Sequence, residues 1–472
     1  MEKPRIIPQG TVFAFILLTV LFFSWGLPNN LTDTMLAAFK RIMSLSDSRT
    51  AWIQVVCYLL GYGCFAVPAA LFIKKYSYKK GVMLGLGMYT AGAFLFWPAM
   101  LCLPLSAGLS FGMYLFAIFI LFAGLSILET SANSYVFAIG PEETATRRLN
   151  LAQSFNPVGS ITGVIISQIF ILSKLNTLTA NERTVLLAEE LEQIQGAELN
   201  VVSMTYVAIG VVMMAILIAI FLTRMPNLKE GGQPVDFAGT FRRLKRNRNY
   251  IWGIVAQFFY VGAQIAVWSF VIRYSMQQMK FDEAIGGLGQ NPSPDAIIAQ
   301  LRSMEPLAAG FYNLCETVRL DVMLPRTAEQ AGATYYILSL ILFVTMRFVC
   351  TGMMKFVKPR NLLAILSIAA VACCMATVYG EGRIGVYALI GISGCMSLMF
   401  PTIYGMGISG LGEDTKIGGA GMVMAIAGAA LLTQIQGIVS DSTASIEFAY
   451  WVPAVAFIII AYYSLFICKK YQ

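Results

Sequence analysis

The 472-residue sequence contains no histidine. This absence removes imidazole as a proton carrier and excludes a serine–histidine hydrolytic site. Charged residues are also scarce, at 12% of the chain, whereas hydrophobic residues make up 57%. A water-soluble domain of ordinary proportions cannot bury so large an apolar fraction. The composition therefore predicts an integral membrane protein.

Other chemistry-bearing patterns are missing as well. The nine cysteines are scattered and lack the spacing of metal ligands, which indicates small apolar packing residues. No phosphate-binding glycine loop occurs, so nothing supports ATP as an energy source. The net charge of +8 suggests contact with the cytoplasmic face of a membrane rather than with nucleic acid. We therefore expect no cofactor, no metal site and no nucleic-acid partner, and we do not expect an enzyme.

Long apolar runs dominate what is present. A membrane-spanning helix requires about 20 predominantly apolar residues. Twelve runs of this kind lie near residues 11–38, 50–73, 81–103, 109–139, 149–172, 201–223, 249–276, 333–354, 361–379, 384–409, 418–440 and 447–468. The first run carries Asp33 and lacks a small-residue cleavage site, so we interpret it as a span rather than a signal peptide. The predicted fold is an all-α membrane protein with twelve transmembrane helices.

The loops between these runs predict orientation and domain organisation. Basic residues are most frequent in the loops on the side of the N-terminus, so the positive-inside rule places both termini in the cytoplasm. Segment 224–248 is polar and basic and contains Pro226 and Pro234, which is typical of a linker. We predict two six-helix halves, 1–223 and 249–472, as in secondary transporters built from repeats. The second half carries an external insert at 277–332, with a helix near 295–304.

Two carboxylates interrupt the apolar runs. Glu129, in the stretch ILETSANSYVFAIG, is eleven residues from the inner end of its run, about 16 Å along a helix and halfway across a core of about 30 Å. A charge there costs about 2.5–3.5 kcal/mol, and neutralising a glutamate at pH 7 costs about 3.7 kcal/mol. Because these costs are similar, the proton of Glu129 is poised to bind and leave. We predict that Asp33 and Glu129 are proton carriers.

Amides and aromatic residues accompany these carboxylates at helical spacing. Candidate ligand-binding residues are Glu129 itself, Asn133 one turn later, Gln153 and Asn156 on an edge shared with Asn150, and Tyr260, Gln264 and Trp268 on a stripe that begins at Gln257. Buried polar faces in hydrocarbon need partners or water, so we expect them to line a shared cavity. Amides donate and accept as sugar hydroxyls require, and an aromatic ring can cover the apolar face of a pyranose. The same chemistry would suit amino acids or drugs.

Six motifs, in order, resemble those of the fucose–proton symporter family of the major facilitator superfamily. They are FFSWGLPNNLTD, KKYSYKKG, LETSANSYV, RLNLAQSFNPVG, FYVGAQIAVWSFVIRY and FPTIYGMGISGLGEDTKIG. The resemblance implies an alternating-access transporter that imports a monosaccharide, L-fucose or a related hexose, with protons across a bacterial inner membrane, and acts as a monomer. It also implies that Asp33 and Glu129 are the essential carboxylates. By the same resemblance Asn30, Gln153 and Asn156 would be polar cavity residues, with Gln264 and Trp268 opposite them.

Two alternatives to proton–sugar symport stay open at this point. A carboxylate can bind sodium as well as a proton, so sodium-coupled sugar transport is the first. The second is a membrane sensor that binds sugar without transporting it, although the chain shows no appended signalling domain.

Overall fold

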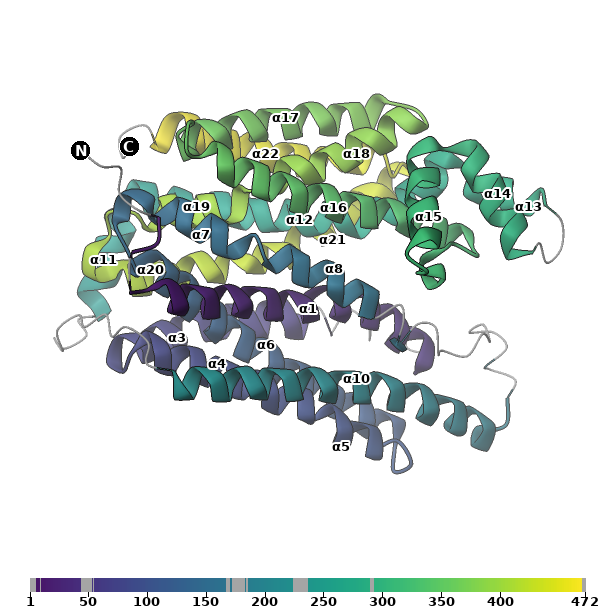
Figure 1. The fold of residues 1–472 in the computed structure, drawn as a ribbon, viewed down its shortest axis with the longest axis horizontal. Helices are drawn as coiled ribbons and strands as arrows, with labels where there is room; N and C mark the ends of the chain where they lie inside the picture. Colours follow the sequence, from purple (N-terminus) through teal and green to yellow (C-terminus); the bar gives the residue numbers. More distant parts are fainter. Residues whose placement is uncertain are drawn as a thin grey trace. The chain divides into compact units, whose positions relative to one another are not determined.

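The computed structural model describes residues 6–8, 10–43, 53, 55–166, 170–171, 183, 186–223, 237–288 and 293–468, without the side chains of 28–41, 55, 188, 237, 322 and 329. Every regular element in these residues is helical (Figure 1). Each of the twelve predicted runs corresponds to at least one helix. Ten helices in this part of the chain are long and apolar enough to cross a membrane, and Val12–Leu27 is a shorter apolar stretch. The predicted all-α membrane fold is confirmed.

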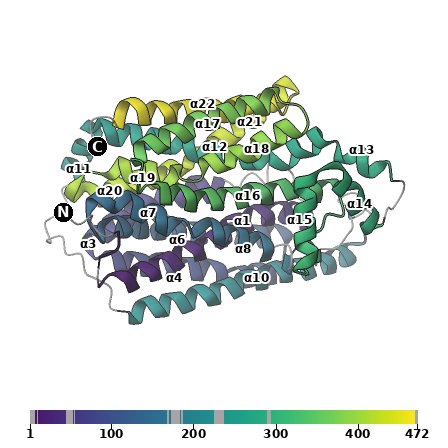
Figure 2. The ribbon, with the colours of Figure 1, turned by 45° about the horizontal axis from the view of Figure 1, so that its top comes forward.

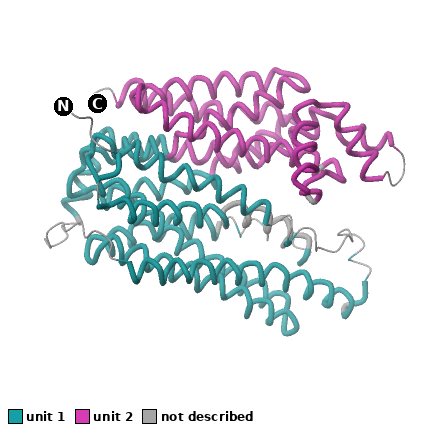
Figure 3. The backbone as a smooth tube through the Cα atoms, in the orientation of Figure 1, with its two compact units in different colours: residues 1–257, 401–430 teal, residues 258–400, 431–472 magenta. Residues whose placement is uncertain are grey.

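The chain forms two compact units (Figure 3). Unit 1 contains residues 1–257 and 401–430, and unit 2 contains residues 258–400 and 431–472. We number the spans in the order of the twelve predicted runs. Spans 7 (249–276), 10 (384–409) and 11 (418–440) therefore each contribute residues to both units. The division into halves 1–223 and 249–472, with a linker at 224–248, stays a prediction.

Unit 1 contains most of the first half of the chain. Its elements are α1 (Val12–Ile42), η1 (Val55–Gly63), α3 (Cys64–Lys75), α4 (Tyr78–Phe94), α5 (Phe96–Leu101), α6 (Ala107–Ala138), η2 (Glu142–Thr144), α7 (Ala145–Gln153), α8 (Asn156–Ile166), α10 (Ala188–Leu222) and α11 (Phe237–Arg246). It also includes the start of α12 (Arg248–Met279), most of α19 (Met399–Ile408), η6 (Gly412–Asp414), α20 (Thr415–Met424), η7 (Ala425–Ala427) and the start of α21 (Gly428–Thr443). Helix α11 shows that part of the predicted linker is helical.

Helix α6, which carries Glu129, packs closely along α4. Glycine makes this approach possible, because a Cβ added to Gly124 would lie 2.5 Å from the backbone nitrogen of Tyr89. Small residues allow membrane helices to bring their backbones together, where van der Waals contact replaces the hydrophobic drive available in water. The backbone around Glu129 is therefore held firmly from the α4 side.

Arg148 of α7 caps the end of α6. Its side chain is fully buried, and it donates hydrogen bonds to the carbonyl oxygens of Val136 at 2.8 Å, Phe137 at 2.6 Å and Pro141 at 3.3 Å. The last carbonyls of a helix have no partner within the helix, and a cation there interacts favourably with the helix dipole. Arg148 thus fixes the turn between spans 4 and 5.

Unit 2 contains most of the second half of the chain. Its elements are the rest of α12 and α21, α13 (Phe281–Gly286), α14 (Pro294–Met304), α15 (Pro306–Thr317), η5 (Asp321–Met323), α16 (Ala328–Met353), α17 (Pro359–Tyr379), α18 (Arg383–Met396), η8 (Phe448–Tyr450), α22 (Trp451–Tyr462) and η9 (Tyr463–Ile467). Helices α17, α18 and α22 pack together, and α18 also packs on α16. Helix α14 confirms the predicted helix near 295–304.

The insert at 277–332 folds onto the ends of unit 2 helices. Figures 1 and 2 both show α13, α14 and α15 gathered beyond α16 and α18. Glu305 caps α15 by accepting a hydrogen bond from the backbone N–H of Ala308 at 2.9 Å, and it also accepts one from the hydroxyl of Tyr387 in α18. Phe281 stacks on Tyr335 of α16, with ring centroids 5.9 Å apart. The insert is therefore an ordered part of unit 2.

Candidate functional site

Glu129 lies in a buried polar cluster of unit 1. Its side chain is 7% exposed, and it forms a hydrogen bond with the hydroxyl of Tyr62. Tyr62 belongs to η1, a π-helical segment of span 2, and such segments often occur at functional sites. The carboxylate therefore has a neutral partner, and no ion pair to Glu129 occurs among the described residues.

Asn133 extends the cluster by one helical turn. Its side chain lies beside Glu129, and its Oδ1 accepts a hydrogen bond from Nε2 of Gln153 at 2.6 Å. Its Nδ2 is buried and has no well-formed hydrogen bond in the described structure. The structure thus brings together three residues predicted from sequence, Glu129, Asn133 and Gln153.

Further side-chain hydrogen bonds continue this network within unit 1. Nδ2 of Asn150 donates to Oγ1 of Thr402 at 3.2 Å, and the hydroxyls of Ser134 and Tyr404 lie 3.2 Å apart. Asn150 and Ser134 come from spans 5 and 4, whereas Thr402 and Tyr404 belong to α19. The α19 part of span 10 therefore contacts the helices that carry the Glu129 cluster.

Three of the predicted residues have other surroundings or fall outside the description. Nδ2 of Asn156 donates to the backbone carbonyl of Phe22 at 3.2 Å, so this donor holds α8 against α1. The side chains of Asn30 and Asp33 lie outside the described residues, and their predicted roles stay predictions.

In unit 2, the predicted residues of α12 line up beside α16 and α18. Trp268 is half-buried, and its indole nitrogen donates to Oγ of Ser393 at 3.1 Å. Tyr260 is fully buried, and its hydroxyl donates to the carbonyl of Met396 at 3.1 Å. Gln264, between them in sequence, is half-buried. Two of the three side chains thus bind α18 near its C-terminal end.

Sequence reasoning did not assign roles to Tyr62, Ser134, Thr402, Tyr404 and Ser393. Hydroxyl-bearing residues are common in membrane helices, where they often hydrogen-bond to neighbouring helices, so their presence alone carried little signal. The π-helical form of η1, which distinguishes Tyr62, is not visible in the letters CYLLGYG.

A second polar cluster lies near α11 in unit 1. Nε of Arg243 donates to Oδ2 of Asp414 at 2.7 Å, and the hydroxyl of Thr240 donates to Oδ1 of Asp414 at 2.8 Å. Oε1 of Glu142 accepts hydrogen bonds from Oγ of Ser409 at 3.1 Å and from the backbone N–H of Gly410 at 2.7 Å. These contacts fasten α11 and the α19–α20 loop to unit 1.

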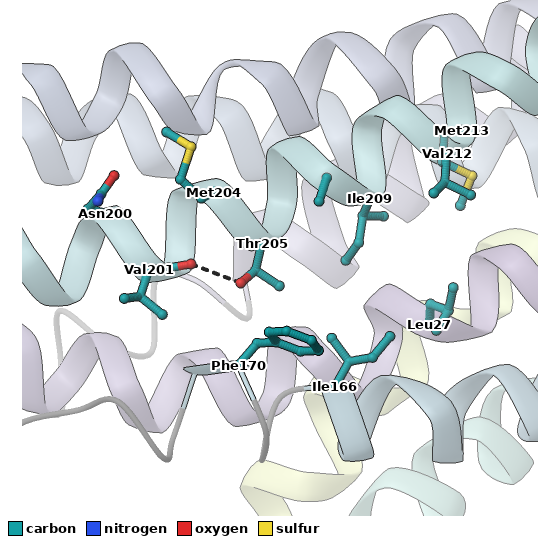
Figure 4. A pocket seen from close by; sticks show the side chains of 11 residues that line it. Leu27, Ile166, Phe170, Asn200, Val201, Met204, Thr205, Ile209, Val212 and Met213 are labelled. Carbon is teal, nitrogen blue, oxygen red and sulfur yellow. Dashed lines mark hydrogen bonds between the residues drawn. The ribbon is translucent and has the colours of Figure 1, made fainter.

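The pocket drawn in Figure 4 does not resemble a sugar site. It has a volume of about 510 Å³ and lies between α1, α8 and α10. Apart from Asn200 and Thr205 its lining residues are apolar, and the hydroxyl of Thr205 already donates to the carbonyl of Val201 at 2.8 Å. Sugar sites need several convergent donors and acceptors. The polar clusters around Glu129 and Trp268 are therefore the better candidates.

Known proteins match the chain over nearly its whole length. An L-fucose-proton symporter of Haemophilus influenzae is 35% identical over 98% of this chain and 97% of its own length. The L-fucose-proton symporter of Escherichia coli is 32% identical over 97% and 94%. A glucose/galactose transporter of Brucella abortus is 26% identical over 96% and 93%.

Solved structures agree with these matches. A crystal structure of the Escherichia coli fucose:proton symporter has a TM-score of 0.79 and 31% identity, and the match covers 97% of this chain and 99% of that one. A proton:xylose symporter, at 10% identity and a TM-score of 0.64, shares the fold. The Major Facilitator Superfamily model matches residues 14–433. The chain therefore belongs to the major facilitator superfamily.

Proposed function

We propose that this protein imports a monosaccharide by proton symport. The two relatives above 30% identity are both named as L-fucose-proton symporters, and the relatives named for glucose and galactose match at 26%. L-Fucose is therefore the first sugar to test, followed by galactose and glucose. A transporter of this kind releases its substrate unchanged and uses no cofactor.

The observation that carries the proposal is the environment of Glu129. Among the other buried carboxylates in the described part of the chain, Glu198 pairs with Arg183 and Asp414 pairs with Arg243, while Glu305 lies in the insert. Glu129, in contrast, has a hydroxyl and an amide as its neighbours. A carboxylate with neutral partners can take up and release a proton without breaking an ion pair, so its charge can follow the transport cycle.

The residues proposed to contact the sugar are given for each unit by itself. In unit 1 these are Asn133, Gln153 and Asn156, with Glu129 beside them and Asn30 from span 1. In unit 2 they are Tyr260, Gln264 and Trp268. Asp33 is proposed as the second proton-coupling carboxylate, because it is the other acidic residue within a predicted span of unit 1. The two carboxylates titrate as a pair if they interact.

The membrane context completes the proposal. We place the protein in the bacterial inner membrane as a monomer, surrounded by lipid, with both termini in the cytoplasm. The charge bias of the loops supports this orientation. Reaction of single cysteines placed near each terminus with a membrane-impermeant maleimide tests it, since neither should react in intact cells.

Purified protein in proteoliposomes tests the transport function. Labelled L-fucose should accumulate when the external pH is lowered, without sodium on either side, and adding L-fucose should make a weakly buffered external medium more alkaline. Accumulation only with a sodium gradient would indicate sodium coupling. If preloaded vesicles exchanged no labelled sugar from the panel of fucose, galactose and glucose, the protein would be a sensor or would carry another substrate.

A further inference from the structure

Span 10 is not one continuous helix, and its interruption lies close to the residues that surround Trp268 in unit 2. Helix α18 ends at Met396 and α19 begins at Met399. In a continuous helix the carbonyl of Ser397 would accept a hydrogen bond from residue 401, but residue 401 is proline and has no N–H to donate. Backbone groups within a membrane must be satisfied inside the protein. The interruption therefore requires donors from other helices.

Two side chains supply these donors. The hydroxyl of Tyr260, from α12, donates to the carbonyl of Met396 and accepts from the backbone N–H of Phe400, so it bridges the interruption. Nε of Arg347, from α16, donates to the carbonyl of Ser397. Together they replace the helical hydrogen bonds that the interruption removes.

A neutral hydroxyl would have been enough at the second carbonyl, as Tyr260 shows at the first. Arg347 instead places a guanidinium in the membrane, buried to 3% exposure, and a charge at that depth is expensive. Its position at the C-terminal end of α18 offsets part of that cost through the helix dipole. The remaining cost indicates that Arg347 does more than satisfy one carbonyl.

The second contact of Arg347 leads to Trp268. The guanidinium carbon lies 4.7 Å from the ring centroid of Phe343. The same Phe343 ring packs edge-to-face against Trp268, with centroids 5.1 Å apart. Trp268 is also bound to Ser393, one turn before the interruption. The indole is thus held on one side by Phe343 and on the other by the end of α18, and Arg347 contacts both supports.

We propose that Arg347 is a positioning residue for sugar binding: it fixes the span 10 interruption and the Phe343 ring, and through them the orientation of the Trp268 indole. This inference rests on the proposed function, in which Trp268 contacts the sugar. Arg347 itself does not touch the sugar in this scheme. The planar guanidinium donates to the Ser397 carbonyl and lies over the Phe343 ring, and a lysine ammonium would reproduce these contacts only in part.

A double-mutant cycle on sugar binding tests the proposal. Arg347→Met should weaken L-fucose binding about 10-fold in purified protein, measured by isothermal titration or scintillation proximity, and Arg347→Lys should weaken it less. In the Trp268→Ala background, Arg347→Met should cause little further loss, because its effect passes through the indole. Arg273→Met is the matched control, since Arg273 also lies over a phenylalanine ring, Phe270 at 4.4 Å, but is exposed; it should leave binding unchanged.

The possible outcomes separate this proposal from the proposed function. Additive losses in the double variant would overturn the positioning role, and so would unchanged affinity in Arg347→Met. If Trp268→Ala alone binds sugar normally, the assignment of Trp268 fails, and with it the positioning role, but proton-coupled transport is untouched. Ser393→Ala removes the indole hydrogen bond without altering Arg347, so it keeps the test possible if Arg347→Met does not fold; its loss should also vanish in the Trp268→Ala background.

Discussion

Buried polar groups have different kinds of hydrogen-bond partner in the Glu129 cluster of unit 1 and in the Trp268 region of unit 2. Around Glu129, side chains bind side chains, as in the contacts to Tyr62 and between Asn133 and Gln153. Around Trp268, the tyrosine and the arginine bind backbone carbonyls at a helix interruption. In the proposed function the first region gains and loses a proton, while the second carries the permanent charge of an arginine.

The difference suggests a division of labour. A titrating carboxylate among neutral partners can bind or release a proton in response to the proton gradient. A fixed cation at a helix interruption can hold an aromatic surface in place. We therefore expect variants in unit 1 to change the coupling between proton and sugar, and variants in unit 2 to change sugar affinity while the coupling persists.

The largest expected effect comes from Glu129→Gln. Glutamine keeps the size and hydrogen-bonding capacity of a protonated glutamate but cannot release a proton. Only the return of the empty carrier requires that release, so proton-driven accumulation of sugar should be abolished while sugar–sugar exchange survives at least in part. Uptake and counterflow in the same proteoliposome preparation measure the two activities.

Asp33→Asn is the control for this experiment. Either carboxylate could be the coupling site, and the two variants separate them. If Glu129→Gln still concentrates sugar against its gradient, coupling belongs to Asp33, and Glu129 is left as a hydrogen-bonding partner of the sugar.

Trp268→Ala should give the next largest effect, on sugar affinity rather than on proton coupling. Loss of the ring removes apolar contact with the sugar, about 1.4 kcal/mol or tenfold in affinity, but no titrating group. Sugar-induced proton uptake at saturating sugar should therefore be retained. Equal affinity for wild type and variant would show that the indole serves helix packing alone.

Tyr62→Phe should have a smaller effect. It removes one hydrogen bond to Glu129, typically worth about 0.5–1.5 kcal/mol, and leaves the aromatic contact with Phe122 in place. The initial rate of proton-driven uptake should fall about threefold, with less change in exchange. A variant in which both activities fall equally would place Tyr62 in sugar binding or folding rather than in coupling.

Deletion of residues 285–325 should have the smallest effect on transport. The insert contacts unit 2 through Glu305 with Tyr387 and through Tyr312 with Thr334, at the ends of α16 and α18 rather than at Trp268. Initial uptake should stay within about twofold of wild type, as expected for a surface insertion. Loss of binding in a deletion variant that still reaches the membrane would assign the insert a functional role.

Sequence alone was sufficient for the membrane spans and for the strongest polar signal. Apolar runs of this length have few other interpretations, and a glutamate in the middle of one is rare enough to attract attention. The helix in the insert was also predictable, because Ser293 and Pro294 provide a cap and a favourable first position at its start. These features depend on local chemistry, which sequence contains directly.

The parts that escaped prediction depend on how separate helices meet. Pro401 predicts a missing hydrogen bond within span 10. The sequence does not show that Arg347 and Tyr260, from two other spans, supply the replacement donors. Likewise the letters do not say that the amide donor of Asn156 contacts the backbone of Phe22. Hydropathy identifies which residues are buried and leaves their partners undetermined.

The buried Arg148 has a consequence for the order in which the protein is made. The acceptors at the end of α6 emerge from the ribosome first, and their donor follows 11 and 12 residues later. Until then these carbonyls need water or lipid headgroups as partners, since hydrocarbon offers none. Spans 4 and 5 are therefore best released into the membrane as a pair. A ribosome that stalled between them would leave the last carbonyls of α6, the helix that carries Glu129, without the hydrogen bonds from Arg148.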